Sequence, residues 1–544
     1  MLHKIHIPVM GICYTVDSPI RVAPFGMTSV ISLVDDGLLE EYRMAYAERE
    51  GIDVGAPEHE RVGRIRAYLD FVADEIERRF AALQGLRIHG GLAPQFATGS
   101  AEGPNDKDRY FLMLPADSPL RKEYEQVCSK QGMARIGAEV ELTSKMEMGE
   151  IQANIMVNLN HMDAALDAVH GFALSKIRGS LVLSAGINLG VFEEIARHEC
   201  FYRRANASGE QSTAPSKKII LKVSDYRSAL TQGRYLAKKG LEVSEYRIES
   251  GVNCGGHAFC TAKKLLPDVL KEFVANKQEL FDMTRSAIEK FAKSVPPSAP
   301  ARITAQGGIC TAEEVEQILA LGADGVGVGT PFLLVPQATS SDRDTRRRLA
   351  AATLDDVQLT HASPLGIPFM NLLTSTAAEL CREKADREPG FPCKQHYLCR
   401  EIPGFDHPIC MASREYVRHR LAEIDSMESS GSYTHEEAQR LRRETLEREC
   451  ICRFLGNAGR EELRERNPSL HFDNREVAAA RTGAPLAREP VTVCPGPNIA
   501  YFNREYTLLE MMQHLYGTGP QLTPADKPHA FDLEREILGK IKSV

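Results

Sequence analysis

A regular alternation of short apolar runs and helix-like segments occupies the middle of this chain, between about residues 150 and 330. The β-branched, apolar runs are Ile155–Leu159, Leu181–Ser184, Ile219–Val223, Tyr246–Glu249, Arg302–Ala305 and Gly325–Val328. The segments with helical periodicity between them are Asp163–Ile177, Phe192–His198, Tyr226–Lys239, Pro267–Phe291 and Ala312–Leu321. Continuous apolar strands that alternate with helices predict a parallel sheet that is covered on both faces.

Two more strand-like segments, Pro19–Phe25 and Thr28–Val34, precede this region. With the six later runs they make eight βα units, which predicts a closed (β/α)8 barrel, the TIM-barrel fold. An open, doubly wound sheet is the alternative, but no strand is followed by the Gly-x-Gly-x-x-Gly turn of dinucleotide-binding sheets. A Gly-x-x-x-x-Gly-Lys-Ser/Thr loop is also missing, which argues against P-loop nucleotide chemistry.

Two further regions do not fit the barrel pattern. An insertion at about residues 37–135 starts with a long helix, because apolar residues recur at spacings of three and four from Val62 to Leu83, and it continues as a loop-like segment over 85–135. Charged, helix-prone segments and proline-rich turns follow the barrel. We therefore expect a barrel with its insertion over residues 1–380 and a mostly helical, cysteine-containing extension over residues 381–544.

The composition narrows the classes of partner. The chain has 544 residues, of which 26% are charged, and a net charge of -8, so it has no general attraction to nucleic acid or anionic lipid. No apolar stretch is long enough for a transmembrane helix, and Met1–Met10 lacks the apolar region of a signal peptide. We expect a cytoplasmic protein with reduced thiols and no membrane contact. Nothing in the sequence indicates an oligomeric state.

Glycine-rich turns follow the seventh and eighth expected strands. They read Gln306-Gly307-Gly308-Ile309 and Gly327-Val328-Gly329-Thr330. Glycines at the carboxyl ends of barrel strands let backbone N–H groups approach a phosphate, and a following helix adds the positive end of its dipole. Thr311 and Glu314 have the spacing of a capping box at the start of such a helix. These turns predict a phosphate site, and tight turns without a ligand are the alternative.

A histidine follows a pair of glycines after the sixth expected strand, in Asn253-Cys254-Gly255-Gly256-His257. Imidazole titrates near neutral pH, so His257 at the mouth of the barrel can act as a general base. The alternative is an incidental loop histidine. Cys254 could be a nucleophile, but we interpret it as a small buried side chain.

The order of these motifs resembles that of the FMN-dependent nitronate monooxygenases, formerly called 2-nitropropane dioxygenases, over about residues 7–375. In that family an Ala-Pro-Met-type turn follows the first strand, and Ala23-Pro24-Phe25-Gly26 occupies this place with Phe instead of Met. The family has an Asn at the end of its third strand, matched by Asn158. Its Glu-Ala-Gly-Gly-His loop is similar to residues 253–257, although the Glu and Ala are replaced. Its phosphate loops are similar to the two glycine-rich turns, which other FMN barrels share.

The resemblance implies an oxidoreductase with FMN bound across the top of the barrel and without a metal ion. The implied cofactor-binding residues are Ala23, Phe25, Gly26, Asn158, Lys222, Gly256, Gly307, Gly308, Gly329 and Thr330. Lys222 would approach the ring, where a cation stabilises negative charge on the reduced flavin; a lysine that reaches solvent is the alternative. His257, the implied catalytic residue, would take a proton from a small-molecule substrate or position its anion, and dioxygen would reoxidise the flavin.

Other functions stay open at this point. One is an FMN-dependent flavoenzyme similar to enoyl reductases or to glutamate synthase, and another is a barrel lyase or isomerase that binds a phosphorylated sugar without flavin. Six of the thirteen cysteines lie between Cys393 and Cys494: Cys393, Cys399, Cys410, Cys450, Cys452 and Cys494. A zinc site or an iron–sulfur cluster needs several converging thiolates, and no Cys-x-x-Cys pair is present. We therefore interpret these cysteines as buried free thiols, with a metal site as the alternative.

Overall fold

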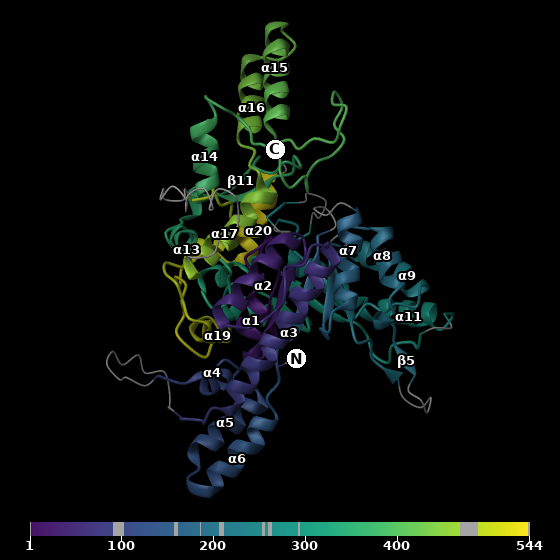
Figure 1. The fold of residues 1–544 in the computed structure, drawn as a ribbon, viewed down its shortest axis with the longest axis vertical. Coiled ribbons are helices and arrows are strands. Elements are labelled where there is room, and N and C mark those ends of the chain that lie inside the picture. Colours follow the sequence, from purple (N-terminus) through teal and green to yellow (C-terminus); the bar gives the residue numbers. More distant parts are fainter. Residues whose placement is uncertain are drawn as a thin grey trace.

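A computed structural model describes residues 2–90, 103–156, 162–184, 186–205, 212–252, 256–258, 264–291, 294–467 and 488–541. Parallel strands close into a barrel in the order β1-β10-β9-β8-β7-β4-β3-β2, which confirms the predicted TIM barrel (Figure 1). The strands are β1 (Ile5–Ile7), β2 (Thr28–Ser32), β3 (Ile151–Ile155), β4 (Ser180–Leu183), β7 (Lys218–Val223), β8 (Glu245–Glu249), β9 (Arg302–Gln306) and β10 (Gly325–Gly327). The pairing of Ile5 with Val326 closes the ring.

Helices lie around the outside of the barrel, packed against its strands or against one another. They are α7 (Met162–Leu174), α8 (Leu189–Ala196), α9 (Tyr226–Lys238), α10 (Leu266–Ala275), α11 (Lys277–Ile288) and α12 (Ala312–Ala320). Asp225 shows how such a helix begins, because its side chain accepts a hydrogen bond from the backbone N–H of Ser228 at the start of α9. A short pair of strands, β5 (Arg204–Ala205) and β6 (Ser212–Thr213), lies outside the barrel.

The first strand is not where the sequence pattern placed it. Residues 19–25 lie in the helix α1 (Ser18–Val22) and the 3-10 helix η1 (Ala23–Phe25), so the predicted strand Pro19–Phe25 is wrong. Pro19 occupies the first turn of α1, where its missing N–H costs nothing. The actual first strand, β1, has three residues and is too short for its pattern to stand out. The strand predicted at Ile155–Leu159 also lies earlier, at β3, and residues 157–160 are outside the described residues.

Helices between β2 and β3 form the insertion. They are α2 (Asp36–Glu50), α3 (Arg61–Gly85), α4 (Asp106–Leu112), α5 (Pro119–Ser129) and α6 (Gly132–Ser144). The long helix predicted from Val62 to Leu83 is confirmed as α3. The loop predicted over 85–135 is wrong where α4, α5 and α6 occur, because Asn105 and Pro119 start helices there instead of interrupting them.

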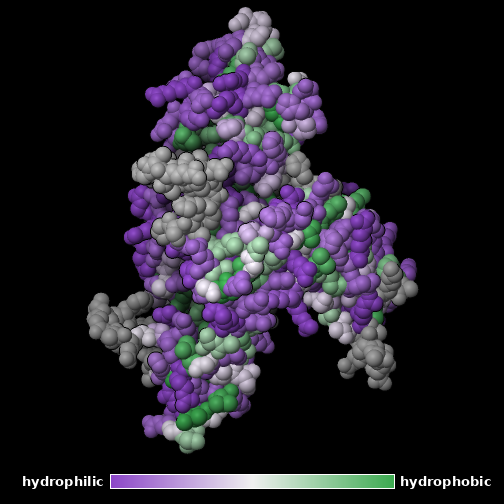
Figure 2. All heavy atoms as spheres, viewed as in Figure 1, coloured by the Kyte–Doolittle hydropathy of each residue, from purple (hydrophilic) through white to green (hydrophobic). Residues whose placement is uncertain are grey.

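The helices α4, α5 and α6 project from the barrel at the lower end of Figure 1. They surround a small core of their own that includes Tyr110, Phe111 and Tyr124. Helix α6 leaves Met133 and Val140 largely exposed, and Figure 2 shows hydrophobic side chains at this end of the molecule.

The part of the chain after β10 wraps over the barrel. Its elements are η3 (Thr330–Leu334), α13 (Arg343–Ala350), η4 (Leu354–Asp356), the hairpin β11 (Val357–Thr360) and β12 (Phe369–Leu372), α14 (Thr376–Lys384), α15 (Arg414–Ser429), α16 (His435–Leu446), α17 (Ile451–Arg466), η5 (Pro497–Tyr501), α19 (Leu508–Leu515) and α20 (Ala530–Ile541). Tyr14, just after β1, donates a hydrogen bond from its hydroxyl to the carbonyl oxygen of Thr492 at 2.7 Å. Phe454 and Met511 belong to the same hydrophobic core as the barrel, so the extension and the barrel share one interior. Among the described helices, none has the length and apolar character needed to span a membrane.

The interior of the barrel is unusually polar. Arg247 of β8 is 1% exposed, forms an ion pair with Glu245 at 2.7 Å and donates to Gln152 at 2.9 Å. Burial alone would oppose ionisation, but Arg247 and its neighbours lower the pKa of the Glu245 carboxyl to about 2. TIM barrels usually fill this space with bulky aliphatic residues. A small apolar cluster is formed here by Val30, Val182 and Ile220.

Candidate active site

A cavity of about 490 Å³ lies at the carboxyl ends of the barrel strands. Its walls include residues from the ends of strands and the turns after them: Met156, Ser184, Lys222, Glu249, Gln306 and Gly327. Cofactor and ligand sites occupy roughly 300–1,000 Å³, and the carboxyl end of a TIM barrel is the end that carries chemistry. The cavity is therefore the candidate active site.

The two glycine-rich turns lie side by side at this cavity, because β9 pairs with β10. Gly307 and Gly308 have φ values of +125° and +74°, a region that favours glycine, and a Cβ on Gly307 would lie 2.7 Å from the Cβ of Ser250. Within the described chain, the backbone N–H groups of Gly307, Gly308 and Gly329 donate to no protein acceptor. The cavity thus has several backbone donors without an acceptor among the described residues, at the place where an anion would be expected.

The helix after the first glycine-rich turn begins as predicted. The side chain of Thr311 accepts a hydrogen bond from the backbone N–H of Glu314, and the Glu314 carboxylate accepts one from the N–H of Thr311, so the capping box of α12 is confirmed. The hydroxyl oxygen of Thr330 is also engaged, since it accepts a hydrogen bond from the N–H of Gly496 at 3.0 Å.

Lys222 is part of the cavity wall and does not extend into solvent. Its ammonium group lies 3.1 Å from Oε1 of Glu249, and both side chains are more than nine-tenths buried. The amide nitrogen of Gln306 donates to the same carboxylate oxygen at 2.7 Å. The carbonyl oxygen of the Gln306 side chain and both amide atoms of Asn154 are buried without a partner in the described residues. Of these two residues, Gln306 lines the cavity, so its carbonyl oxygen is available to a polar group of a ligand.

His257 lines the cavity beside Gly256. Its Nε2 lies 2.7 Å from the hydroxyl oxygen of Ser363, and its ring packs edge-on against Phe369 with centroids 5.0 Å apart. The backbone around it is tied to the start of β12, since the N–H of Met370 donates to the carbonyl oxygen of Gly256 at 2.7 Å. The hairpin of β11 and β12 therefore fixes the position of the imidazole.

Not every predicted site residue reaches this cavity. Ala23, Phe25 and Gly26 precede β2, so they lie at the amino ends of the strands, where the carbonyl oxygen of Ala23 accepts a hydrogen bond from Gly149 before β3. Asn158 is outside the described residues. The turn after the true first strand, Pro8-Val9-Met10-Gly11, lines the cavity instead. Its proline, methionine and glycine were the signal that could have identified it.

Residues far along the chain cover the cavity. The ones that line it are Leu365, Leu398, Ile451, Cys452, Leu455, Val493 and Cys494. Asn498 also contacts the phosphate-loop region, because its side-chain N–H donates to the carbonyl oxygen of Gly308 at 3.0 Å. None of these residues belongs to a motif in the sequence that indicates the contact.

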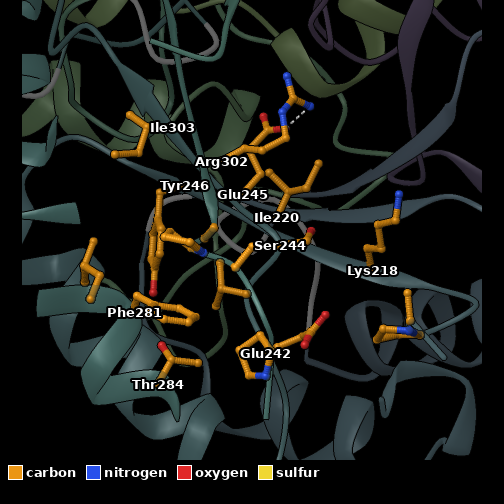
Figure 3. A pocket seen from close by; sticks show the side chains of 18 of the residues that line it. Lys218, Ile220, Glu242, Ser244, Glu245, Tyr246, Phe281, Thr284, Arg302 and Ile303 are labelled. Carbon is orange, nitrogen blue, oxygen red and sulfur yellow. Dashed lines mark hydrogen bonds and ion pairs between the residues drawn. The ribbon is translucent and has the colours of Figure 1, made fainter. Parts of the chain in front are cut away.

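A second pocket, of about 260 Å³, lies at the opposite end of the barrel. Figure 3 shows Lys218, Glu245 and Arg302, which come from the first residues of β7, β8 and β9. Arg302 forms an ion pair with Glu245 at 3.2 Å. Because this is the amino end of the strands, we assign these residues to barrel stability rather than to chemistry.

Comparisons with known proteins agree with a barrel of this kind. Residues 205–383 match the sequence model of the nitronate monooxygenase family. No protein of curated function matches the chain. Three similar solved structures are the enoyl reductase domain of MlnA from the macrolactin biosynthesis cluster of Bacillus amyloliquefaciens (15% identity, TM-score 0.37, 76% of this chain and 87% of that one), FabK from Thermotoga maritima (14%, 0.33, 76% and 85%) and nitroalkane oxidase from Streptomyces ansochromogenes (13%, 0.31, 71% and 83%). These structural similarities are too distant to argue an activity. In its barrel portion, this chain resembles the nitronate monooxygenase family.

Proposed function

We propose that this protein is an FMN-dependent oxidoreductase that acts on a small-molecule substrate. The observation that carries the proposal is a set of backbone donors, at Gly307, Gly308 and Gly329, that have no acceptor in the part of the chain that the structure describes and lie on neighbouring turns of one cavity. A phosphate group satisfies such donors, and a flavin mononucleotide matches a cavity of this size and position. The resemblance to nitronate monooxygenases supports flavin over a phosphorylated sugar.

The residues of the cavity suit the parts of FMN. Gly307, Gly308, Gly329 and Thr330 would bind the phosphate, and Gly256 lets the covering segment pack closely. Lys222 would place its positive charge beside the ring system, where it is anchored by Glu249. FMN, when bound, supplies an acceptor for two electrons.

His257 would accept a proton from a carbon of the substrate, or position a substrate anion. Histidine is the side chain that most often acts as a general base in enzymes. The contact with Ser363 holds one ring nitrogen and so fixes the orientation of the ring. Dioxygen would be the final electron acceptor, as in the family that the barrel resembles.

The first experiment identifies the bound chromophore. Protein purified from a host that makes flavins should absorb at flavin wavelengths and release FMN on denaturation. Oxygen consumption with nitronates, compared with reduction of enoyl substrates, then separates the two flavoenzyme classes. A colourless protein that takes up no FMN would refute the cofactor and leave the barrel lyase or isomerase.

The second experiment tests His257. We expect His257→Asn to retain FMN and to lose turnover by about 10²-fold or more, the usual contribution of a general base. His407→Asn is a control, because His407 is an exposed residue of the extension. Full activity of His257→Asn would remove this residue from the chemistry.

A further inference from the structure

The extension contains a compact group of metal-ligating side chains outside the cavity. The ligand atoms of Cys393, His396 and Cys399 all lie within 4.8 Å of one another. The two sulfur atoms are 3.8 Å apart, and Sγ of Cys399 is 3.7 Å from Nδ1 of His396. The side chain of His396 is exposed and the two thiols are half-buried, so an ion could reach them from solvent.

These distances match the edges of a small tetrahedron. Zinc binds thiolate sulfur at about 2.3 Å and imidazole nitrogen at about 2.0–2.1 Å in tetrahedral sites, which places neighbouring ligand atoms roughly 3.5–3.8 Å apart. An iron–sulfur cluster needs more room, because its cysteines bind different irons around an inorganic core. A disulfide would need the sulfurs at about 2.05 Å. The spacing of Cys393 and Cys399 therefore fits one ion between them.

The backbone of this segment is arranged as in a metal-binding turn. The sequence Cys393-Lys-Gln-His396-Tyr-Leu-Cys399 puts two residues between successive ligands. His396 has a φ of +59°, a value unusual for a residue other than glycine, and its backbone N–H donates to the sulfur of Cys393. The N–H of Cys410 donates to the sulfur of Cys399.

Cys410 is not one of the three residues of this group, but it is the candidate for a fourth ligand. A hairpin-like contact between Arg400 and Ile409, with hydrogen bonds of 3.2 and 2.9 Å, brings Cys410 back to the turn. Its thiol forms a hydrogen bond with that of Cys393.

We propose that Cys393, His396, Cys399 and Cys410 bind a structural zinc ion. This replaces the expectation that the extension holds only free thiols, and it does not depend on the proposed flavin chemistry. The site has a consequence for the cavity, because Leu398 is buried and lines it directly beside Cys399. Zinc would fix the turn that supplies this part of the cavity wall.

Metal analysis of the full chain tests the proposal. After purification in a buffer with zinc, followed by desalting, elemental analysis should find about one zinc ion per chain. Cobalt exchanged into the same protein should show the absorption of tetrahedral, thiolate-bound Co²⁺. Cys399→Ser and His396→Ala should each lose most of the metal, whereas Cys200→Ser, which alters a half-buried thiol of the barrel region, should retain it.

Other results would overturn the proposal. One is wild-type protein that binds less than about a tenth of an ion per chain with zinc in excess. Another is protein that contains iron and acid-labile sulfide in place of zinc. A third is a Cys393–Cys399 disulfide in peptide mass spectra. Thiol alkylation covers the case in which a variant does not fold. In the wild type, zinc should protect the half-buried thiols of Cys393 and Cys399 from iodoacetamide, and a chelator should remove this protection. Equal labelling with and without zinc would also refute the site. Flavin content is measured on the same samples, so failure of the zinc site and failure of the flavin site are separate results.

Discussion

The buried ion pair between Lys222 and Glu249 is a sharp test of how the cavity is built. Its atoms are 3.1 Å apart, and the side chains are 8% and 5% exposed. At an effective dielectric constant of about 20, two unit charges at this distance attract each other by about 5 kcal/mol. Removing one partner of a buried pair costs about 3–5 kcal/mol, because the other charge is left in a poorly solvated place. Gln306 still donates to Glu249, so we expect Lys222→Met to lower the free energy of unfolding by about 3 kcal/mol.

A double-mutant cycle separates the pair from the loss of either side chain. Lys222→Met, Glu249→Gln and the double variant are unfolded with urea in the flavin-free state, followed by circular dichroism. The double variant contains no unpaired charge, so it should be more stable than Lys222→Met by about 1–2 kcal/mol. If Lys222→Met costs less than about 1 kcal/mol, or if the two single costs simply add, the ion pair does not contribute as argued. Flavin binding to the double variant is measured as well, because this variant lacks the cation but contains no unpaired charge.

Three more predictions concern acid stability and the glycine-rich turns. Burial lowers the pKa of His6 from 6.5 to about 3, so the unfolded chain takes up a proton at a higher pH than the folded protein does, and the stability falls as the pH drops from 6.5 toward 3. His6→Gln should flatten the fall of the thermal midpoint between pH 6.5 and 4, and an unchanged profile would contradict this. Gly307→Ala should destabilise the fold by about 1–3 kcal/mol and impair FMN retention, because the φ of Gly307 is positive. The control Gly137→Ala, on the exposed part of α6, should have neither effect, and equal flavin content in the two variants would place the phosphate elsewhere. Asn498→Leu removes a hydrogen bond to Gly308, worth about 0.5–1.5 kcal/mol, and should therefore raise the FMN dissociation constant about two- to tenfold in a fluorescence titration. An unchanged dissociation constant would show that this contact does not shape the site.

The barrel was predictable because its signals are local. Runs such as Ile219–Val223 are buried strands whatever surrounds them, and the turn at Gly307 and Gly308 needs a conformation that glycine adopts readily. The first strand was not predictable in this way, since three residues of β1 carry little pattern. The β-branched residues near Pro19 belong to a helix that packs against α3 and β2.

One part of the candidate site was likewise predictable from local sequence signals, and another part was not. His257 and the glycine-rich turns follow barrel strands directly, so their position at the cavity could be expected from the order of elements. The cover contributed by Val493 and Cys494 depends on long-range packing, for which no local pattern exists. The group around His396 had a readable signal, but a search for Cys-x-x-Cys pairs overlooks a histidine between two cysteines.

The position of the cavity cover in the chain sets an order of events during synthesis. Translation at roughly 5–20 residues per second delivers Gly327, the end of β10, well before Cys494 and Asn498, by a delay on the order of 10–30 seconds. In that interval the glycine-rich turns are open to water and lack the side chains that later enclose them. Stable capture of a cofactor would then be one of the last steps of maturation, and a chain cut short after the barrel would release its flavin however well its strands had closed.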